Sequence, residues 1–233
     1  MGTALLEALL EAGRHLSERA ITGSTMELYF SPMSCSLATR ITLYELDEPA
    51  SFHQVNLATK QLVVGGDYLQ INPKGQVPAL RTREGVLLTE VPAVLQYVAD
   101  LKPERGLAPK AGTLERYQLQ QWLNYVATEL HKQVFYTIFF PLWPAEAKTF
   151  VRDQVAPMKF EFLSKHLDGR EFMLDGGFTV ADAYLGTALN WCPAAGLDLE
   201  RWPVLRGYLD RLKTRPSVAR AIKEEWALYK AAT

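Results

Sequence analysis

The chain has 233 residues, of which 48% are hydrophobic and 22% are charged, a composition typical of a globular protein with a sizeable core. Its net charge of −1, with both signs mixed along the chain, gives no electrostatic support for binding to nucleic acid or to an anionic membrane. No segment approaches the roughly 18 apolar residues that span a bilayer. Two cysteines, Cys35 and Cys192, are too few for a disulfide framework, which favours a reducing compartment such as the cytoplasm.

Residues 1–25 are predicted to be a dispensable extension. Their leucines have helical spacing, but Glu7 and Glu11 interrupt any signal-peptide core and argue against a mitochondrial transit peptide. The extension is therefore either an additional surface helix or a segment that precedes a natural start at Met26, where the folded pattern begins.

Residues 26–105 are predicted to form a mixed α/β domain. The expected elements are a strand at 27–30, a helix at 35–46, a strand at 52–56, a short helix at 67–69, strands at 77–81 and 86–88, and a helix at 90–101. This order implies a small mixed sheet covered by helices.

The Pro- and Gly-rich segment 102–112 ends this pattern, and the interdomain linker is placed at 106–112. Residues 113–233 are predicted to form an all-helical domain. Its expected helices lie at 113–140, at 145–167 with a kink or break at Pro157, and at 183–191, and two more begin at Pro203 and Pro216.

A helix start is also predicted just before the apolar helix at 183–191. Thr179 can cap it, Asp182 stands three residues later as the capping-box partner, and Phe178 can supply the hydrophobic staple. This pattern indicates a folding element in the core.

Cys35 is the first candidate functional residue. An apolar run at 28–30 ends at Ser31-Pro32 and a helical stripe follows, so the thiol is expected at the first turn of a helix. The unpaired N–H groups and the helix dipole there favour the thiolate. Most lone cysteines are small buried hydrophobes, but Ser34 and Ser36 on either side favour a functional thiol or a thiol in a binding site.

A row of polar residues on the long helix is the second candidate. Tyr117, Asn124 and His131 are seven residues apart each time, and seven residues are nearly two α-helical turns, so their side chains are expected on one face. The row indicates a cleft or a partner, although a solvated stripe with a structural histidine explains the same spacing.

Two further segments could bind a peptide-like ligand. If the Val77–Pro78 bond were cis, Val77 would present free backbone groups at a sheet edge, although most X–Pro bonds are trans. Glu90 and Val91 stand at a helix start, where amides bind a carboxylate and the Glu90 side chain could hold an ammonium group. The simpler interpretation of Glu90 is an acidic residue that stabilises the first turn.

Taken together, these segments resemble the glutathione transferases, most closely the bacterial beta class. The resemblance runs from Met26 to the C-terminal end of the chain. It rests on five segments in order: Ser34–Ala38, Asn72–Leu80, Leu88–Glu90, Trp122–Lys132 and Phe178–Leu185. It implies a thioredoxin-like α/β N-terminal domain, an all-α C-terminal domain, a cytoplasmic homodimer, and glutathione as co-substrate without a metal.

The resemblance also assigns roles to residues. It implies that Pro78 is cis and that Val77 pairs with the backbone of the glutathione cysteine. The implied catalytic residues are Cys35 and His131, and the implied glutathione-binding residues are Cys35, Lys60, Gln76, Val77, Pro78, Glu90, Val91, Asn124 and His131. The second-substrate pocket is expected near Met33, Phe135, Phe139 and Trp191.

One residue departs from the family pattern. The family usually has Ser or Gly after the motif glutamate, and Val91 stands there in this chain. A backbone contact survives the change but a hydroxyl contact does not, so weaker glutathione binding is expected.

The function implied is conjugation of reduced glutathione to hydrophobic electrophiles, a detoxification reaction. One alternative is a glutathione-dependent thiol–disulfide oxidoreductase or peroxidase that uses a Cys35–glutathione mixed disulfide, since no second thiol lies nearby in the motif. The second alternative is a non-catalytic ligand-binding protein. The least favoured hypothesis is a hydrolase that uses a Cys35–His131 dyad. Cys192 is expected to be a buried core residue.

Overall fold

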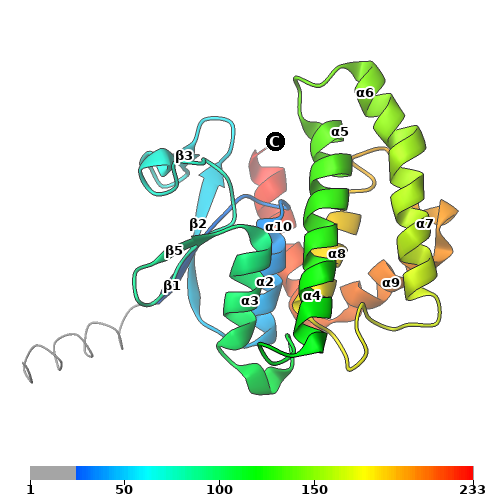
Figure 1. Cartoon of the computed structure of the whole chain (residues 1–233). Coiled ribbons are helices and arrows are strands. Elements are labelled where there is room, and N and C mark those ends of the chain that lie inside the picture. The colour runs from blue at the N-terminus through cyan, green and yellow to red at the C-terminus, as the bar shows by residue number, and fades with distance from the viewer. Residues whose placement is uncertain (1–24, 233) are drawn as a thin grey trace, which may run out of the picture.

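The computed structural model describes residues 25–232 and contains a five-stranded sheet flanked by helices (Figure 1). The strands are β1 (Met26–Phe30), β2 (Ala50–Asn56), β3 (Gln61–Leu62), β4 (Ala79–Arg81) and β5 (Leu87–Thr89), in the spatial order β3-β2-β1-β4-β5. β1 pairs with β2 in parallel, and the other pairings are antiparallel. The sequence did not predict β3, because two residues carry no periodic signal.

The alternation of side chains along β1 explains how the sheet is covered. Leu28 and Phe30 point into the main core with α2 (Ser36–Glu45) and α3 (Val91–Asp100). Tyr29 points to the opposite face and packs with Val55 and Tyr68. The short helix η1 (Tyr68–Gln70) therefore helps to close the second face of the sheet.

The remainder of the described chain is helical and stands beside the sheet (Figure 1). A short turn, η2 (Pro103–Arg105), leads into it. Its elements are α4 (Leu114–Tyr125), η3 (Val126–Tyr136), α5 (Thr137–Phe139), α6 (Ala145–Phe150), η4 (Val151–Val155), α7 (Ala156–Leu167), α8 (Val180–Leu189), η5 (Leu199–Arg201), α9 (Pro203–Thr214) and α10 (Pro216–Ala232). Pro203 and Pro216 begin the last two helices, as predicted. The boundary at 106–112 and the extension 1–25, almost all of which lies outside the described residues, stay predictions.

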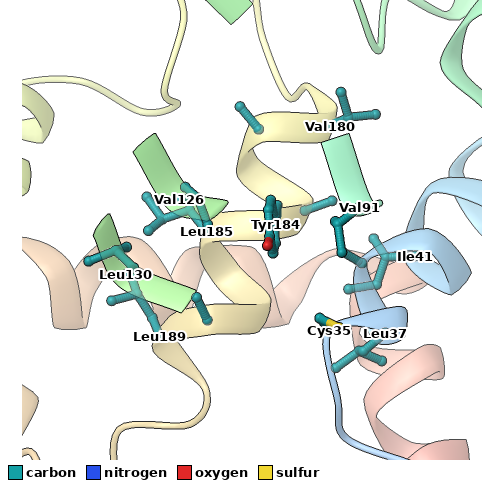
Figure 2. Packing of buried hydrophobic residues seen from close by; sticks show 14 of the residues in the cluster. Cys35, Leu37, Ile41, Val91, Val126, Leu130, Val180, Tyr184, Leu185 and Leu189 are labelled. Atoms are coloured by element: carbon teal, nitrogen blue, oxygen red, sulfur yellow. The ribbon is translucent and has the colours of Figure 1, made fainter. Parts of the chain in front are cut away.

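The predicted capping box is present at the start of α8. The Thr179 side chain accepts from the backbone of the third helical residue, and Asp182 accepts from the amide of Thr179 at 2.8 Å. α8 is buried almost completely, between α2 and the long helix of the helical domain. Figure 2 shows Tyr184 of α8 between Cys35 on one side and Leu130 on the other. The box thus starts the helix that joins the two halves of the core.

The long predicted helix at 113–140 is continuous from Leu114 to Phe139, but its middle segment, η3, is π-helical. A π-helix closes each hydrogen bond over one more residue than an α-helix. Asn124 and His131 therefore do not share a face as closely as the α-helical spacing predicted. Tyr117 and Asn124 are exposed, whereas His131 is half-buried.

The second predicted helix, 145–167, also changes its winding. Residues 151–155, η4, are π-helical, and Pro157 stands at the start of α7. The chain thus meets proline at a helix-start position, where its missing N–H is tolerated, with the irregularity on its N-terminal side. No helix of the described residues is both long and apolar enough to cross a membrane.

Candidate active site

Cys35 lies where the sequence predicted it, at the N-cap of α2. Its side chain is 7% exposed, and its Sγ donates a hydrogen bond to the carbonyl of Val77 at 3.0 Å. The Val77–Pro78 bond is cis, as the resemblance implied. Val77 stands just before β4, and its carbonyl is not free, because the Cys35 thiol already occupies it.

Burial raises the pKa of the Cys35 thiol to about 12. The amides of Cys35 and Ser36 and the charge of Lys132 act in the opposite direction but do not offset the loss of solvent. The amides at the helix start favour the thiolate, as the sequence analysis expected, but burial outweighs them and keeps the Cys35 thiol neutral. The sequence placed the residue correctly, but the helix start could not reveal that α8 and the main core would shield the thiol from water.

Glu90 and Val91 occupy the start of α3. Glu90 is the N-cap and has a left-handed backbone, with φ 68°, which is uncommon for a residue with a Cβ. Its Oε1 lies 2.7 Å from Nζ of Lys74, and both side chains are more than half exposed. In the first turn of α3, the amide of Ala93 donates to the carbonyl of Glu90 at 3.0 Å and Pro92 has no N–H, so the amide of Val91 is the one without a partner inside the helix. An ammonium group that binds Glu90 would therefore compete with Lys74.

Lys60 and Gln76 lie beside the cis peptide. Nζ of Lys60 donates to the carbonyl of Gly75 at 2.8 Å, directly before Gln76. The Gln76 side chain is exposed, while its carbonyl accepts from Tyr68 and from Asn72, each at 2.8 Å. The backbone of this loop is thus held by Lys60, Tyr68 and Asn72, and the Gln76 side chain is exposed to solvent.

His131 is held by a phenol that the sequence analysis did not identify. Its Nδ1 lies 2.8 Å from Oη of Tyr184, which is 1% exposed. Burial lowers the pKa of His131 to about 4, so the ring is neutral at physiological pH. Since the buried Tyr184 hydroxyl needs an acceptor, we assign the proton to the phenol oxygen and the imidazole hydrogen to Nε2. His131 can then donate a hydrogen bond from Nε2.

The residues expected to line the second-substrate pocket differ in how far their side chains are exposed. Trp191 packs against His131 with ring centroids 5.1 Å apart, and its Nε1 donates to the carbonyl of Met33 at 2.8 Å. Phe139 is 44% exposed and stacks on Phe135, which is fully buried. Phe135 therefore belongs to the core beneath the expected pocket.

Sequence reasoning missed several residues whose partners are distant along the chain. Burial has the largest effect on the pKa of Cys35 and of His131, and the charge of Lys132, which the sequence analysis names only within a motif, acts to lower both. Tyr184 was assigned to an apolar core helix. Glu225, in α10, accepts from the amide of Met33 across 192 residues, and no local pattern indicates such a contact.

Cys192 is fully buried, as predicted, and burial raises its pKa to about 12. It lies on the wall of a cavity of about 470 Å³ between the end of α8 and α9. The residues that line this cavity do not include Cys35 or His131. Within residues 25–232, no cluster of three or more His, Cys, Asp or Glu side chains could hold a metal ion.

The chain matches two family models. The model of the glutathione S-transferase N-terminal domain matches residues 32–101, and that of the C-terminal domain matches residues 153–211. The chain is 42% identical to glutathione S-transferase GstA of Escherichia coli O157:H7 over 86% of this chain and 98% of that protein.

Solved structures agree with these matches. A bacterial beta-class glutathione S-transferase of Sphingomonas chungbukensis is 41% identical, with a TM-score of 0.82 over 85% of this chain and 98% of that one. A sphingomonad glutathione S-transferase solved with glutathione is 39% identical, with a TM-score of 0.81 and the same coverage. The chain belongs to the glutathione S-transferase family. The predictions of family, fold and glutathione transferase activity are thereby confirmed.

Proposed function

We propose that this enzyme conjugates reduced glutathione to hydrophobic electrophiles in the cytoplasm, as part of detoxification, and that it needs no metal. The observation that carries the proposal is the hydrogen bond between Cys35 and Val77, which brings the start of α2 to the cis-proline loop. Cys35 and Cys192 are both free thiols, which fits a reducing compartment.

The geometry supports the glutathione site that the family resemblance implies. The ligand's cysteine backbone would pair with Val77, and its γ-glutamyl end would meet the first turn of α3 at Glu90 and Val91. The proposed site residues are Cys35, Lys60, Gln76, Val77, Pro78, Glu90, Val91, Asn124 and His131. Since Cys35 already bonds to the Val77 carbonyl, bound glutathione would compete with that thiol or share the carbonyl with it.

The chemistry requires the glutathione thiol to ionise at neutral pH. A shift of its pKa from about 9 to between 6 and 7 corresponds to about 3–4 kcal/mol. The first amides of α2, the Lys132 charge and the Nε2 hydrogen of His131 can stabilise the anion. The sulfur then attacks the electrophilic carbon, a C–S bond forms, and the leaving group departs with its electron pair.

The burial and hydrogen bonding of Cys35 favour conjugation over disulfide exchange. A thiol that is buried, neutral and hydrogen-bonded is a poor nucleophile, because the thiolate is the reactive form. A one-thiol cycle through a mixed disulfide would need Cys35 to leave the Val77 carbonyl first. A non-catalytic binding role is the other alternative, and an enzyme that binds glutathione but conjugates no electrophile would favour it.

We expect Cys35→Ala to keep most conjugation activity, and His131→Ala to lower kcat about 10- to 100-fold while the KM for glutathione changes less than about threefold. The kcat loss is the effect of one hydrogen bond to a developing charge. The measurement is glutathione conjugation to a chlorodinitrobenzene.

His53→Ala is the control for this experiment, since His53 lies on β2 and contacts Tyr29 and Glu27, neither of which is assigned to the site. Equal loss of kcat and of glutathione affinity in His131→Ala would contradict its catalytic role. Loss of all activity in Cys35→Ala would favour disulfide exchange.

The protein is further proposed to be a homodimer. Large apolar side chains remain exposed on α6 and α7, among them Phe150 (61%), Met158 (63%) and Phe162 (51%). A second copy would remove such a surface from water. Light scattering in solution tests this, and the mass of a single chain at micromolar concentration would refute it.

A further inference from the structure

Met33, two residues before Cys35, has a left-handed backbone with φ 61°. Two side chains of the helical domain hold its peptide groups. Its N–H donates to Oε2 of Glu225 at 2.7 Å, and its carbonyl accepts from Nε1 of Trp191 at 2.8 Å. A residue with a Cβ stays in this conformation only where its surroundings hold it there.

Glu225 is itself held in place. It is fully buried on α10, and its Oε1 lies 3.0 Å from Nε of Arg40 on α2. The Arg40 guanidinium lies over the rings of Phe30 and Phe52, at 4.4 and 4.0 Å from their centroids. A buried carboxylate is costly unless it is paired and hydrogen-bonded, and Glu225 has both kinds of partner. Its second oxygen is thereby directed at the Met33 amide.

The connection from Met33 to the thiol is short and ordered. The amide of Ser34 donates to the carbonyl of Ser31 at 3.1 Å, and α2 begins directly after Cys35. A shift of the Met33 peptide groups would therefore move the thiol relative to the Val77 carbonyl, 3.0 Å from it. Val77 is the residue to which the proposed function assigns the glutathione backbone.

We propose that Glu225 and Trp191 are positioning residues of the glutathione site. They hold the peptide groups on either side of Met33, and so fix Cys35 and the first turn of α2 against Val77. The expected change in glutathione binding rests on the proposed function. The expected change in the position of Cys35 rests on the contacts alone.

The kinetic test uses Glu225→Ala, Glu225→Gln and Trp191→Phe. We expect the Ala and Phe variants to raise the KM for glutathione about tenfold, the effect of one lost hydrogen bond of this kind. Glu225→Gln keeps an oxygen acceptor for the Met33 amide and should restore most of the loss. A merely structural role would lower the amount of active enzyme and leave this KM unchanged.

Glu224→Gln is the matched control. Glu224 is the neighbouring carboxylate on α10 and pairs with Arg40 at 3.2 Å, and the change removes the same charge. Of the two carboxylates, only Glu225 bonds to Met33. We therefore expect Glu224→Gln to leave the KM for glutathione unchanged. If Glu225→Ala does not fold, Trp191→Phe still removes one of the two bonds without touching the buried ion pair.

A second readout needs no turnover. The rate at which iodoacetamide alkylates Cys35, followed by peptide mass spectrometry, should rise about tenfold in Glu225→Ala and Trp191→Phe, because each variant loses one bond that holds the loop. Labelling of the fully buried Cys192 is the internal reference.

Unchanged Cys35 labelling in both variants would overturn the proposal. Faster labelling with an unchanged KM would overturn its extension to glutathione, and an enzyme inactive on every electrophile would refute only the proposed function.

Discussion

Replacing Asp182 with alanine should lower the free energy of unfolding by about 4 kcal/mol, near the upper end for single substitutions. The carboxylate is fully buried and accepts four hydrogen bonds: from the amides of Met173 (2.7 Å) and Thr179 (2.8 Å), and from the hydroxyls of Thr179 (2.9 Å) and Tyr208 (2.7 Å). Alanine leaves these buried donors without an acceptor, and each unsatisfied group costs about 1–3 kcal/mol.

Urea unfolding at fixed protein concentration measures this effect. Asp182→Asn should recover part of the loss, because one amide oxygen can still accept while the NH₂ group faces donors. Asp175→Ala is the control, since Asp175 is 92% exposed and its pairing with Arg170 lies at the surface. A loss below about 1.5 kcal/mol in Asp182→Ala would mean that the network is not held as the structure describes it.

Glu225→Gln should change how the stability of the protein depends on pH. Burial raises the pKa of Glu225 from 4.5 to about 7, against the opposing effects of Arg40 and the Met33 amide. The folded state thus holds this proton more tightly than the unfolded chain does. The wild type therefore loses stability from this group as pH rises from about 4.5 to about 7, and glutamine removes that loss.

The stability of Glu225→Gln relative to wild type should therefore rise by about 2–3 kcal/mol between pH 5 and pH 8, at 1.36 kcal/mol per pKa unit. The charged and titratable groups that face Glu225 are Arg40 of α2, Cys35, and Glu224 of its own helix. Burial raises the pKa of Glu224, but hydrogen bonds from Tyr44 and Arg220 keep it below its ordinary value. Cys35 and Glu224 titrate outside this range, so parallel pH profiles for the two proteins would contradict the prediction.

Local sequence patterns predicted much of the fold because they act over a few residues. The capping box at Thr179 and Asp182, the start of α2 at Cys35 and the proline starts of α9 and α10 each depend on neighbours within one helical turn. The cis bond at Pro78 came from the family resemblance, since X–Pro bonds are usually trans.

What the sequence could not provide depends on residues that are far apart in the chain. The ionisation of Cys35 is decided by burial beneath other elements, which its own segment does not encode. The Lys74–Glu90 pair spans 16 residues between a loop and a helix start. The π-helical winding of Val126–Tyr136 has no compositional signal, and it altered the predicted alignment of Asn124 with His131.

The contact between Met33 and Glu225 also concerns the order in which the nascent chain emerges during translation. The two residues are 192 positions apart, so the ribosome must add 192 residues after Met33 before the Met33 amide can meet its acceptor. At about 5–20 residues per second this takes about 10–40 seconds. All five strands of the sheet precede that moment in the chain. The loop that carries Cys35 is thus completed only after α10 has been made, although it is among the earliest described segments to be made.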